Sequence, residues 1–252
     1  MIRPILIFII IWTMDLSLTA QNNTLAGPAG TEVCYQVDKK IFPCKWRNNR
    51  TRPEFTSIGA EDIPGTHAIL NTALDKYPEN VLRKNLKRIY VLKTMFFFGL
   101  EYGGTYYKRN VYVTNNGIAN GYTNLYIEGT FHHEFSSVLL KRHKKYFEKE
   151  AWLAANPPDF TYGKGGVAAL STEKTSLRLD SALFADGFLN EYSLASVEED
   201  FNCYAEFIFL GNAGFWDAWK GNETIRRKTE ILISFYQRID PVFTMEYFRS
   251  LQ

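Results

Sequence analysis

The chain has 252 residues, a formal net charge of +2 and a hydrophobic content of 46%. This length suits one large domain, or a domain with an appendage, and the apolar content is sufficient for a sizeable core. The near balance of charge excludes the strong positive field typical of proteins that bind nucleic acid, so we expect no nucleic-acid partner.

The first 20 residues have the pattern of a secretory signal peptide. Arg3 supplies a positive charge, residues 5–12 form an apolar run too short to span a membrane, and Ala20 ends a small-residue cleavage site. We therefore expect export to the periplasm, the cell surface or the medium, with no transmembrane anchor after cleavage. The alternative is a cytosolic chain with an apolar start.

Residues 21–64 are polar and rich in turn-forming residues, which predicts an extended N-terminal segment. If the protein is exported, a disulfide between Cys34 and Cys44 is expected to staple this segment. The third cysteine, Cys203, falls in an apparent helix and is expected to be a buried free thiol.

Residues 65–252 are expected to form the main domain. An apolar stripe after Thr66 predicts a helix capped by that residue, and Pro78 interrupts the pattern before it resumes. Alternating or continuous apolar runs predict strands at 89–92, 95–100 and 111–113, and residues 125–127 fit either a last strand or the entry to a helix.

A distinctive motif lies between Gly129 and Lys141, in a predicted helix that Thr130 can cap and that ends in the basic run 141–145. In a helical H-E-x-x-H motif two histidines lie one turn apart and bind zinc, and the glutamate acts as general base. Here His133 and Glu134 occupy the first two positions.

The pattern of residues after the motif predicts mostly helices. A turn-rich stretch at 156–166 is expected to border a cleft, and Ser196 is expected to cap a helix with Glu199 in a capping box. Further helices are predicted near 215–220, 224–238 and 241–251. Strands come early and helices late, so the fold class is α+β, with a small mixed or antiparallel sheet packed on the motif helix and a mostly helical C-terminal half.

Glu199 and Tyr192 could complete a metal site. A zincin of the gluzincin type takes its third zinc ligand from a carboxylate on a second helix, beside a phenol that can donate to the developing oxyanion. Glu199 lies on such a helix and Tyr192 precedes it by seven residues.

With these residues in view, GTFHHEFSS and DGFLNEYSLASVEEDFNCYAEFIF resemble the zinc-binding metallopeptidases of Bacteroidetes, exported proteins distantly similar to the catalytic domain of anthrax lethal factor. That family reads HEFxH, then a tyrosine, then a helix beginning Glu-x-Phe-Ala-Glu. The resemblance implies a zincin-like fold with His133 as first zinc ligand and Glu134 as general base. It also implies Tyr192 as catalytic tyrosine and Glu199 as carboxylate ligand.

The chain departs from the family pattern at two positions. Ser137 stands where the second histidine ligand belongs, and Cys203 stands where the second glutamate of the downstream motif would lie. A serine hydroxyl is a poor zinc ligand, so zinc is expected to bind weakly or with an atypical ligand set. His132 is the first substitute ligand to consider, although on a helix it points about 100° away from His133.

Two functions remain open from the sequence. The leading hypothesis is an exported zinc-dependent metallopeptidase with a degenerate metal site, which hydrolyses peptide bonds with a metal-activated water. The alternative is a catalytically inactive homologue that binds a peptide or another ligand, or acts as a structural protein of the cell envelope. Either way the expected partner is a peptide or protein.

Overall fold

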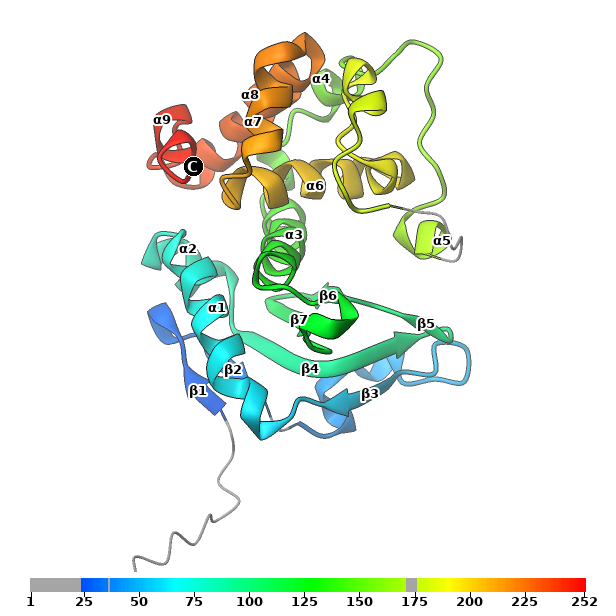
Figure 1. The fold of residues 1–252 in the computed structure, drawn as a ribbon, viewed down its shortest axis with the longest axis vertical. Coiled ribbons are helices and arrows are strands. Elements are labelled where there is room, and N and C mark those ends of the chain that lie inside the picture. The colour runs from blue at the N-terminus through cyan, green and yellow to red at the C-terminus, as the bar shows by residue number, and fades with distance from the viewer. Residues whose placement is uncertain (1–23, 36, 171–175) are drawn as a thin grey trace, which may run out of the picture.

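The computed structural model describes residues 24–35, 37–170 and 176–252, so the predicted signal peptide at 1–20 lies outside the described residues. Within the described part of the chain, no helix is both long enough and apolar enough to cross a membrane. A sheet occupies the N-terminal half and helices occupy the C-terminal half (Figure 1), which confirms the predicted α+β class.

One mixed sheet contains all the strands of the described residues. They are β1 (Thr24–Ala26), β2 (Glu32–Cys34), β3 (Glu54–Ser57), β4 (Arg88–Phe97), β5 (Leu100–Glu101), β6 (Gly104–Tyr107) and β7 (Asn110–Thr114). Strands β2, β4 and β7 are parallel, and the order across the sheet is β1-β2-β4-β7-β6, with β6 antiparallel at the edge. The two strands predicted at 89–92 and 95–100 are largely one long strand, β4, because Lys93 and Thr94 between them continue the strand without a turn.

The two faces of the sheet pack against different layers. Ile89 and Val91 of β4 face the main core that the helices cover, whereas Leu92 and Met95 belong to a smaller aromatic cluster on the opposite face. Alternation would place residues 92 and 95 on opposite faces. The register between β3 and β4 shifts in this stretch, and such an irregularity lets both residues face the same side.

The helices largely match the predicted segments. They are α1 (Ile63–Asp75), α2 (Glu79–Asn85), α3 (Asn124–Arg142), α4 (Lys149–Leu153), α5 (Gly166–Leu170), α6 (Val197–Phe209), α7 (Ala213–Gly221), α8 (Glu223–Ile239) and α9 (Met245–Arg249). The break at Pro78 and the end of α3 in the basic run are confirmed. Residues 125–127 prove to be the entry to α3.

Two predicted helix caps are wrong. α1 begins three residues before Thr66, whose hydroxyl instead donates to the carbonyl of Asp62 at 2.7 Å. α3 begins after Thr123, which accepts a hydrogen bond from the amide of Tyr126, while Thr130 lies inside the helix. Both errors have one cause: threonine can cap a helix or bond back to the carbonyl four residues earlier, and the pattern of residue types does not separate the two.

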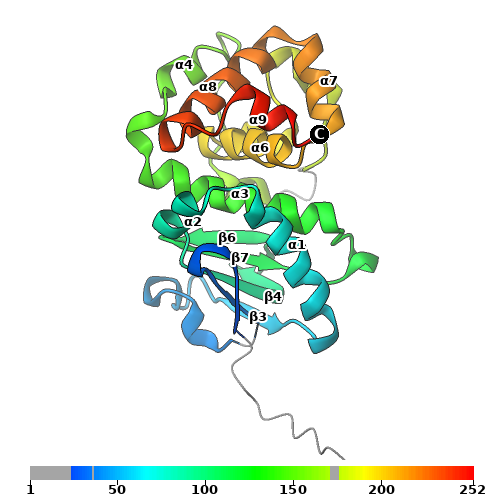
Figure 2. The ribbon, with the colours of Figure 1, turned by 90° about the vertical axis from the view of Figure 1, so that its left-hand side faces the viewer.

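The motif helix α3 runs between the sheet and the helical half (Figure 2). Phe131, Phe135, Val138 and Leu139 are fully buried in the main core. On its other side α3 packs against α6, so the two predicted motif segments lie against each other across one interface. This packing positions the candidate site.

The predicted disulfide between Cys34 and Cys44 is not formed. Cys34 is buried on β2, where the hydroxyl of Thr24 donates to its sulfur at 3.8 Å, and Cys44 is exposed on the surface beside Arg47. The two thiols therefore face different surroundings, and spacing along the chain could not reveal this. Cys203 is buried and free, as expected.

Candidate functional site

A cavity of about 790 Å³ opens where α3, α6 and the edge strand β6 meet. His133, Glu134 and Ser137 line it from α3, and Glu199 lines it from α6. Tyr192, from a short 3-10 helix at Glu191–Ala195, completes the set of residues that the sequence singled out. The motif spacing predicts that these five side chains lie at one cleft, and all five line this cavity.

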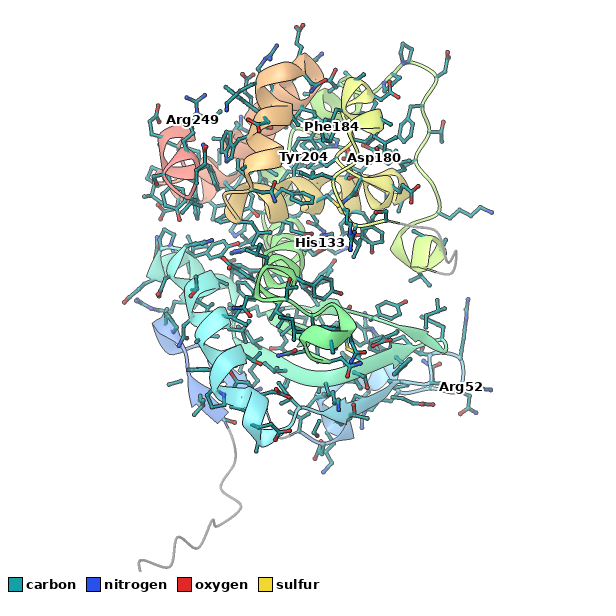
Figure 3. The ribbon with its side chains drawn as sticks, viewed as in Figure 1. Arg52, His133, Asp180, Phe184, Tyr204 and Arg249 are labelled. Carbon is teal, nitrogen blue, oxygen red and sulfur yellow. The ribbon has the colours of Figure 1, made fainter. Side chains whose placement is uncertain are left out.

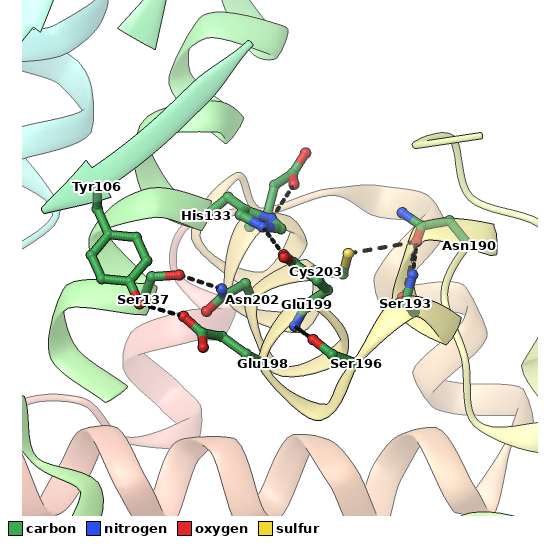
Figure 4. A network of polar contacts seen from close by, with 11 residues as sticks. Tyr106, His133, Ser137, Asn190, Ser193, Ser196, Glu198, Glu199, Asn202 and Cys203 are labelled. Atoms are coloured by element: carbon green, nitrogen blue, oxygen red, sulfur yellow. Dashed lines mark hydrogen bonds and ion pairs between the residues drawn. The ribbon is translucent and has the colours of Figure 1, made fainter. Parts of the chain in front are cut away.

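His133 lies at the centre of the site, held between two carboxylates of α6 (Figure 4). Its Nε2 atom is 3.0 Å from Oε2 of Glu199, and its Nδ1 atom is 3.3 Å from Oε2 of Glu206. Burial alone would lower the pKa of His133, but hydrogen bonds with Cys203, Glu199 and Glu206 raise it well above the usual value. Both ring nitrogens of His133 thus have carboxylate partners.

The side chain of Glu199 contacts His133 and does not cap the N-terminus of α6. The hydroxyl of Ser196 accepts a hydrogen bond from the amide of Glu199 at 3.2 Å, so the predicted N-cap is confirmed. The carboxylate of Glu199, which would turn back to Ser196 in a complete capping box, instead reaches His133.

Glu134 and Tyr192 face the same cavity. Burial raises the pKa of Glu134 to about 8, with nearby Glu199 adding to the rise and His133 opposing it. Burial also raises the pKa of Tyr192, whose ring centroid lies 5.8 Å from that of His133. A neutral phenol and a carboxyl poised near neutral pH can both donate a hydrogen bond to a ligand in the cavity.

The segment before Tyr192 closes over this part of the site. α5 begins at Gly166, whose Cα approaches the Glu199 carboxylate and the Tyr192 hydroxyl so closely that a Cβ would collide with both. Gly166 and Val167 also line the cavity, so the turn-rich stretch that ends at 166 does border the cleft, as predicted.

Ser137 lies one turn after His133 on α3 and also faces α6. Its hydroxyl accepts a hydrogen bond of 2.6 Å from the side-chain amide of Asn202 (Figure 4). Ser137 is 3% exposed and Asn202 is fully buried. The position at which the H-E-x-x-H pattern would have its second histidine is therefore occupied by a polar contact between the two helices.

Cys203, on the same helix as Glu199, also takes part in a second hydrogen-bond group. Its sulfur donates to Oδ1 of Asn190 at 3.5 Å, and the same oxygen accepts from the amide and hydroxyl of Ser193. Burial raises the pKa of Cys203, which keeps it as a neutral thiol. Asn190 thus ties α6 to the 3-10 helix that carries Tyr192.

His132 does not face the cavity. Its Nδ1 atom is 2.9 Å from the hydroxyl of Tyr77, and its ring stacks on Phe209 with a centroid distance of 5.1 Å. Burial lowers its pKa, so it is a neutral core histidine. The proposal of His132 as a substitute metal ligand is therefore wrong, because the helix turns its side chain to the side away from His133.

The donor set does not fit a zinc site of the usual kind. Such a site needs three good protein ligands. Here both ring nitrogens of His133 contact carboxylates, Ser137 is bonded to Asn202, and His132 points elsewhere. Within the described ranges, no group of three His, Cys, Asp or Glu side chains is arranged to hold a metal ion.

Sequence reasoning missed two features of the site. Glu206 contacts His133 and lies two helical turns after Glu199, on the same face of α6, so its spacing was a usable signal. The other feature is the edge strand β6, where the hydroxyl of Tyr106 donates to Oε1 of Glu198 at 2.6 Å. No local pattern indicated which strand would lie beside the motif helix.

No family model and no curated protein matches the chain. Among solved structures, one from Bacteroides caccae, described as a candidate zinc-binding metallo-peptidase, is similar with a TM-score of 0.48. The two sequences are 14% identical over an alignment that covers 73% of this chain and 72% of that chain. A likeness of this size carries no argument about the metal or the activity of this protein.

Proposed function

We propose that this chain is a zincin-like protein that binds a peptide segment in its cleft without metal-dependent hydrolysis. The observation that carries the proposal is the hydrogen bond of 2.6 Å between Asn202 and Ser137, in the place where a zincin has its second histidine. The pairing of His133 with Glu199 and Glu206 supports it, because the remaining histidine is held by protein groups on both ring nitrogens.

The cleft has the features that an extended peptide needs. β6 pairs with β7 on one side, and among the described strands nothing pairs with its other edge, which leaves backbone groups free to add a strand. Residues 103–106 of this edge line the cavity. Leu125, Val167 and Leu177 are exposed apolar residues at the same cavity, and they can contact alternate side chains of a bound peptide.

The first test is metal content together with peptide cleavage. Tag-free protein is dialysed against zinc, freed of excess metal and analysed by mass spectrometry for bound zinc, and the same sample is incubated with a peptide library. We expect far less than one zinc per chain and no cleavage. Stoichiometric zinc with cleavage that a chelator abolishes would overturn the proposal and restore the hydrolase hypothesis.

A repair experiment tests the reason for the loss of metal. A histidine at position 137 would meet Asn202, so Ser137→His alone should bind zinc poorly, whereas Ser137→His combined with Asn202→Gly frees the space. We expect measurable zinc binding only in the double variant, with Asn202→Gly as control. Equal zinc binding by the wild type and the double variant would contradict this account of the site.

Peptide binding is tested at the rim of the cavity. Leu177 is 42% exposed and lines the cavity, whereas Val242 is 43% exposed and lies outside it. Leu177→Glu should weaken binding of peptides selected from a display library by about tenfold, the effect of losing roughly 1.4 kcal/mol of contact. Val242→Glu is the matched control and should leave binding unchanged. Equal effects of both changes would count against the cleft as the binding site.

We also propose that the protein is exported, on the pattern of its first 20 residues. Expression of the full chain in a bacterial host, followed by mass spectrometry of the cell fractions, should find a mature form beginning at Gln21 outside the cytoplasm. An intact N-terminus in the cytoplasmic fraction would contradict export.

A further inference from the structure

A second charged region lies on the face of the sheet opposite α3, in the segment between β2 and β3 and the nearby turn before β7. We call it the basic loop region. It carries six exposed cations, which are Lys40, Lys45, Arg47, Arg50, Arg52 and Lys108. None of these six forms an ion pair with the described residues, although Arg88 on the same sheet is paired with Glu32. The region therefore carries a local excess of uncompensated positive charge.

Two of these cations flank a small pocket. Arg47 and Arg52 line a cavity of about 270 Å³, together with Asn48, Asn49 and the buried ring of Phe42. Figure 3 shows Arg52 at the edge of the molecule, far from His133 and its cleft. The pocket is thus separate from the candidate peptide site.

Local hydrogen bonds build the loop that carries both arginines. The side chain of Asn48 donates to the carbonyl of Lys45 at 2.8 Å and accepts from the amides of Arg50 and Thr51 at 2.9 and 3.0 Å. Arg52 has a φ of 44°, in the left-handed region that a non-glycine residue rarely adopts. These contacts order the backbone of the loop from which both arginines project.

Both guanidinium groups are oriented yet keep free donors. One terminal nitrogen of Arg47 donates to the sulfur of Cys44 at 2.7 Å, and Nε of Arg52 donates to the carbonyl of Asn49 at 2.9 Å. Each guanidinium has five N–H donors, so most of them remain available to a ligand.

Aromatic rings form the surroundings of this pocket. Phe42 contacts Trp46 with a centroid distance of 6.4 Å, and Trp46 in turn lies 5.5 Å from Tyr107. The ammonium groups of Lys45 and Lys108 lie 4.7 and 5.5 Å from the centroid of the Tyr107 ring. The two lysines are therefore held against one ring of the aromatic cluster to which the pocket residue Phe42 also belongs.

We propose that the pocket between Arg47 and Arg52 binds a phosphate group. The planar fork of arginine matches two oxygens of a tetrahedral oxyanion, and two arginines facing one small cavity can hold it from both sides. The asparagines that line the pocket can add neutral hydrogen bonds. The group can come from a soluble phosphate monoester or from the headgroup of an anionic phospholipid, because both present at least two non-bridging, negatively charged phosphate oxygens.

The test compares direct binding in wild type and four variants. Inorganic phosphate and glycerol 1-phosphate are titrated calorimetrically, and vesicles of phosphatidylglycerol with phosphatidylcholine are compared with vesicles of phosphatidylcholine alone, all in physiological salt to screen diffuse attraction. The variants are Arg47→Gln and Arg52→Gln in the pocket, Arg50→Gln beside it, and Arg227→Gln on α8. Circular dichroism confirms that each is folded.

We expect saturable phosphate binding with a dissociation constant on the order of 1 mM, which the two pocket variants weaken by about tenfold or more. Arg50→Gln and Arg227→Gln remove the same charge without lining the pocket, so their effect should be less than about threefold. Binding to anionic vesicles but not to glycerol 1-phosphate would identify a lipid source. The proposal is overturned by absence of binding to every phosphate probe, or by equal losses in Arg227→Gln and the pocket variants.

Discussion

The contribution of the contact between Ser137 and Asn202 to stability can be measured directly. Ser137→Ala removes the acceptor of the 2.6 Å hydrogen bond, and Oδ1 of Asn202 already has no hydrogen-bond partner among the described residues. The variant therefore leaves a buried amide with neither end paired. Such a loss costs about 1–3 kcal/mol, because the buried group loses its partner and regains no water.

The free energy of unfolding of each variant is measured by urea denaturation. For a domain of this size, 1 kcal/mol corresponds to about 2–4 °C in Tm, so we expect Tm to fall by about 2–12 °C. Ser136→Ala is the matched control, since Ser136 is also fully buried but its hydroxyl is not paired with Asn202. Adding Asn202→Leu to Ser137→Ala should recover most of the loss, because it replaces both partners by apolar groups.

The reasoning fails if Ser137→Ala is no more destabilising than Ser136→Ala. That outcome would mean that the hydroxyl at 137 is not tied to Asn202 in solution. Ser137 would then be free to face a ligand in the cavity, and the main support for a non-hydrolytic site would be lost.

Three further predictions concern the buried charges and the tight contacts around the cleft. Lys228 and Asp200 form a fully buried ion pair of 2.8 Å, so Lys228→Met should cost about 3–5 kcal/mol in urea denaturation, and adding Asp200→Asn should restore much of it. Burial raises the pKa of Glu134 in the folded state to about 8, above its ordinary value of 4.5, so the folded state holds a proton that the unfolded chain releases. Ionisation of Glu134 should therefore lower the stability of the folded state as pH rises from about 4.5 to 8. In Glu134→Gln the Tm should depend less on pH across that window than in the wild type. Parallel plots of Tm against pH for the two proteins would contradict the raised pKa. Gly104→Ala would place a Cβ 2.8 Å from the Glu134 side chain and should cost about 1–3 kcal/mol, whereas Gly65→Ala meets no atom within 4 Å and should cost nothing.

Much of the architecture could be predicted from the sequence, because periodic apolar residues and helix breakers act locally. The succession of strands before helices, the break at Pro78 and the N-cap at Ser196 all follow from residues a few positions apart, whereas strands β1, β2, β3 and β6 and helices α4 and α5 were not predicted. Errors arose where one residue type serves two local roles, as Thr130 does. The pairing of Cys34 with Cys44 failed for a different reason, since proximity in sequence does not fix the direction of a side chain.

For the candidate site, the sequence by itself determined which residues share a helix face: His133 with Ser137 on α3, and Glu199 on α6. Only the tertiary structure decided what these faces meet. Packing of α3 on α6 brings together residues 66 positions apart, pairs His133 with Glu199, and closes Ser137 onto Asn202. The physical reason is that helical periodicity reports the direction of a side chain relative to its own axis, whereas a ligand set depends on the distance between two axes. That distance follows from how the whole core packs.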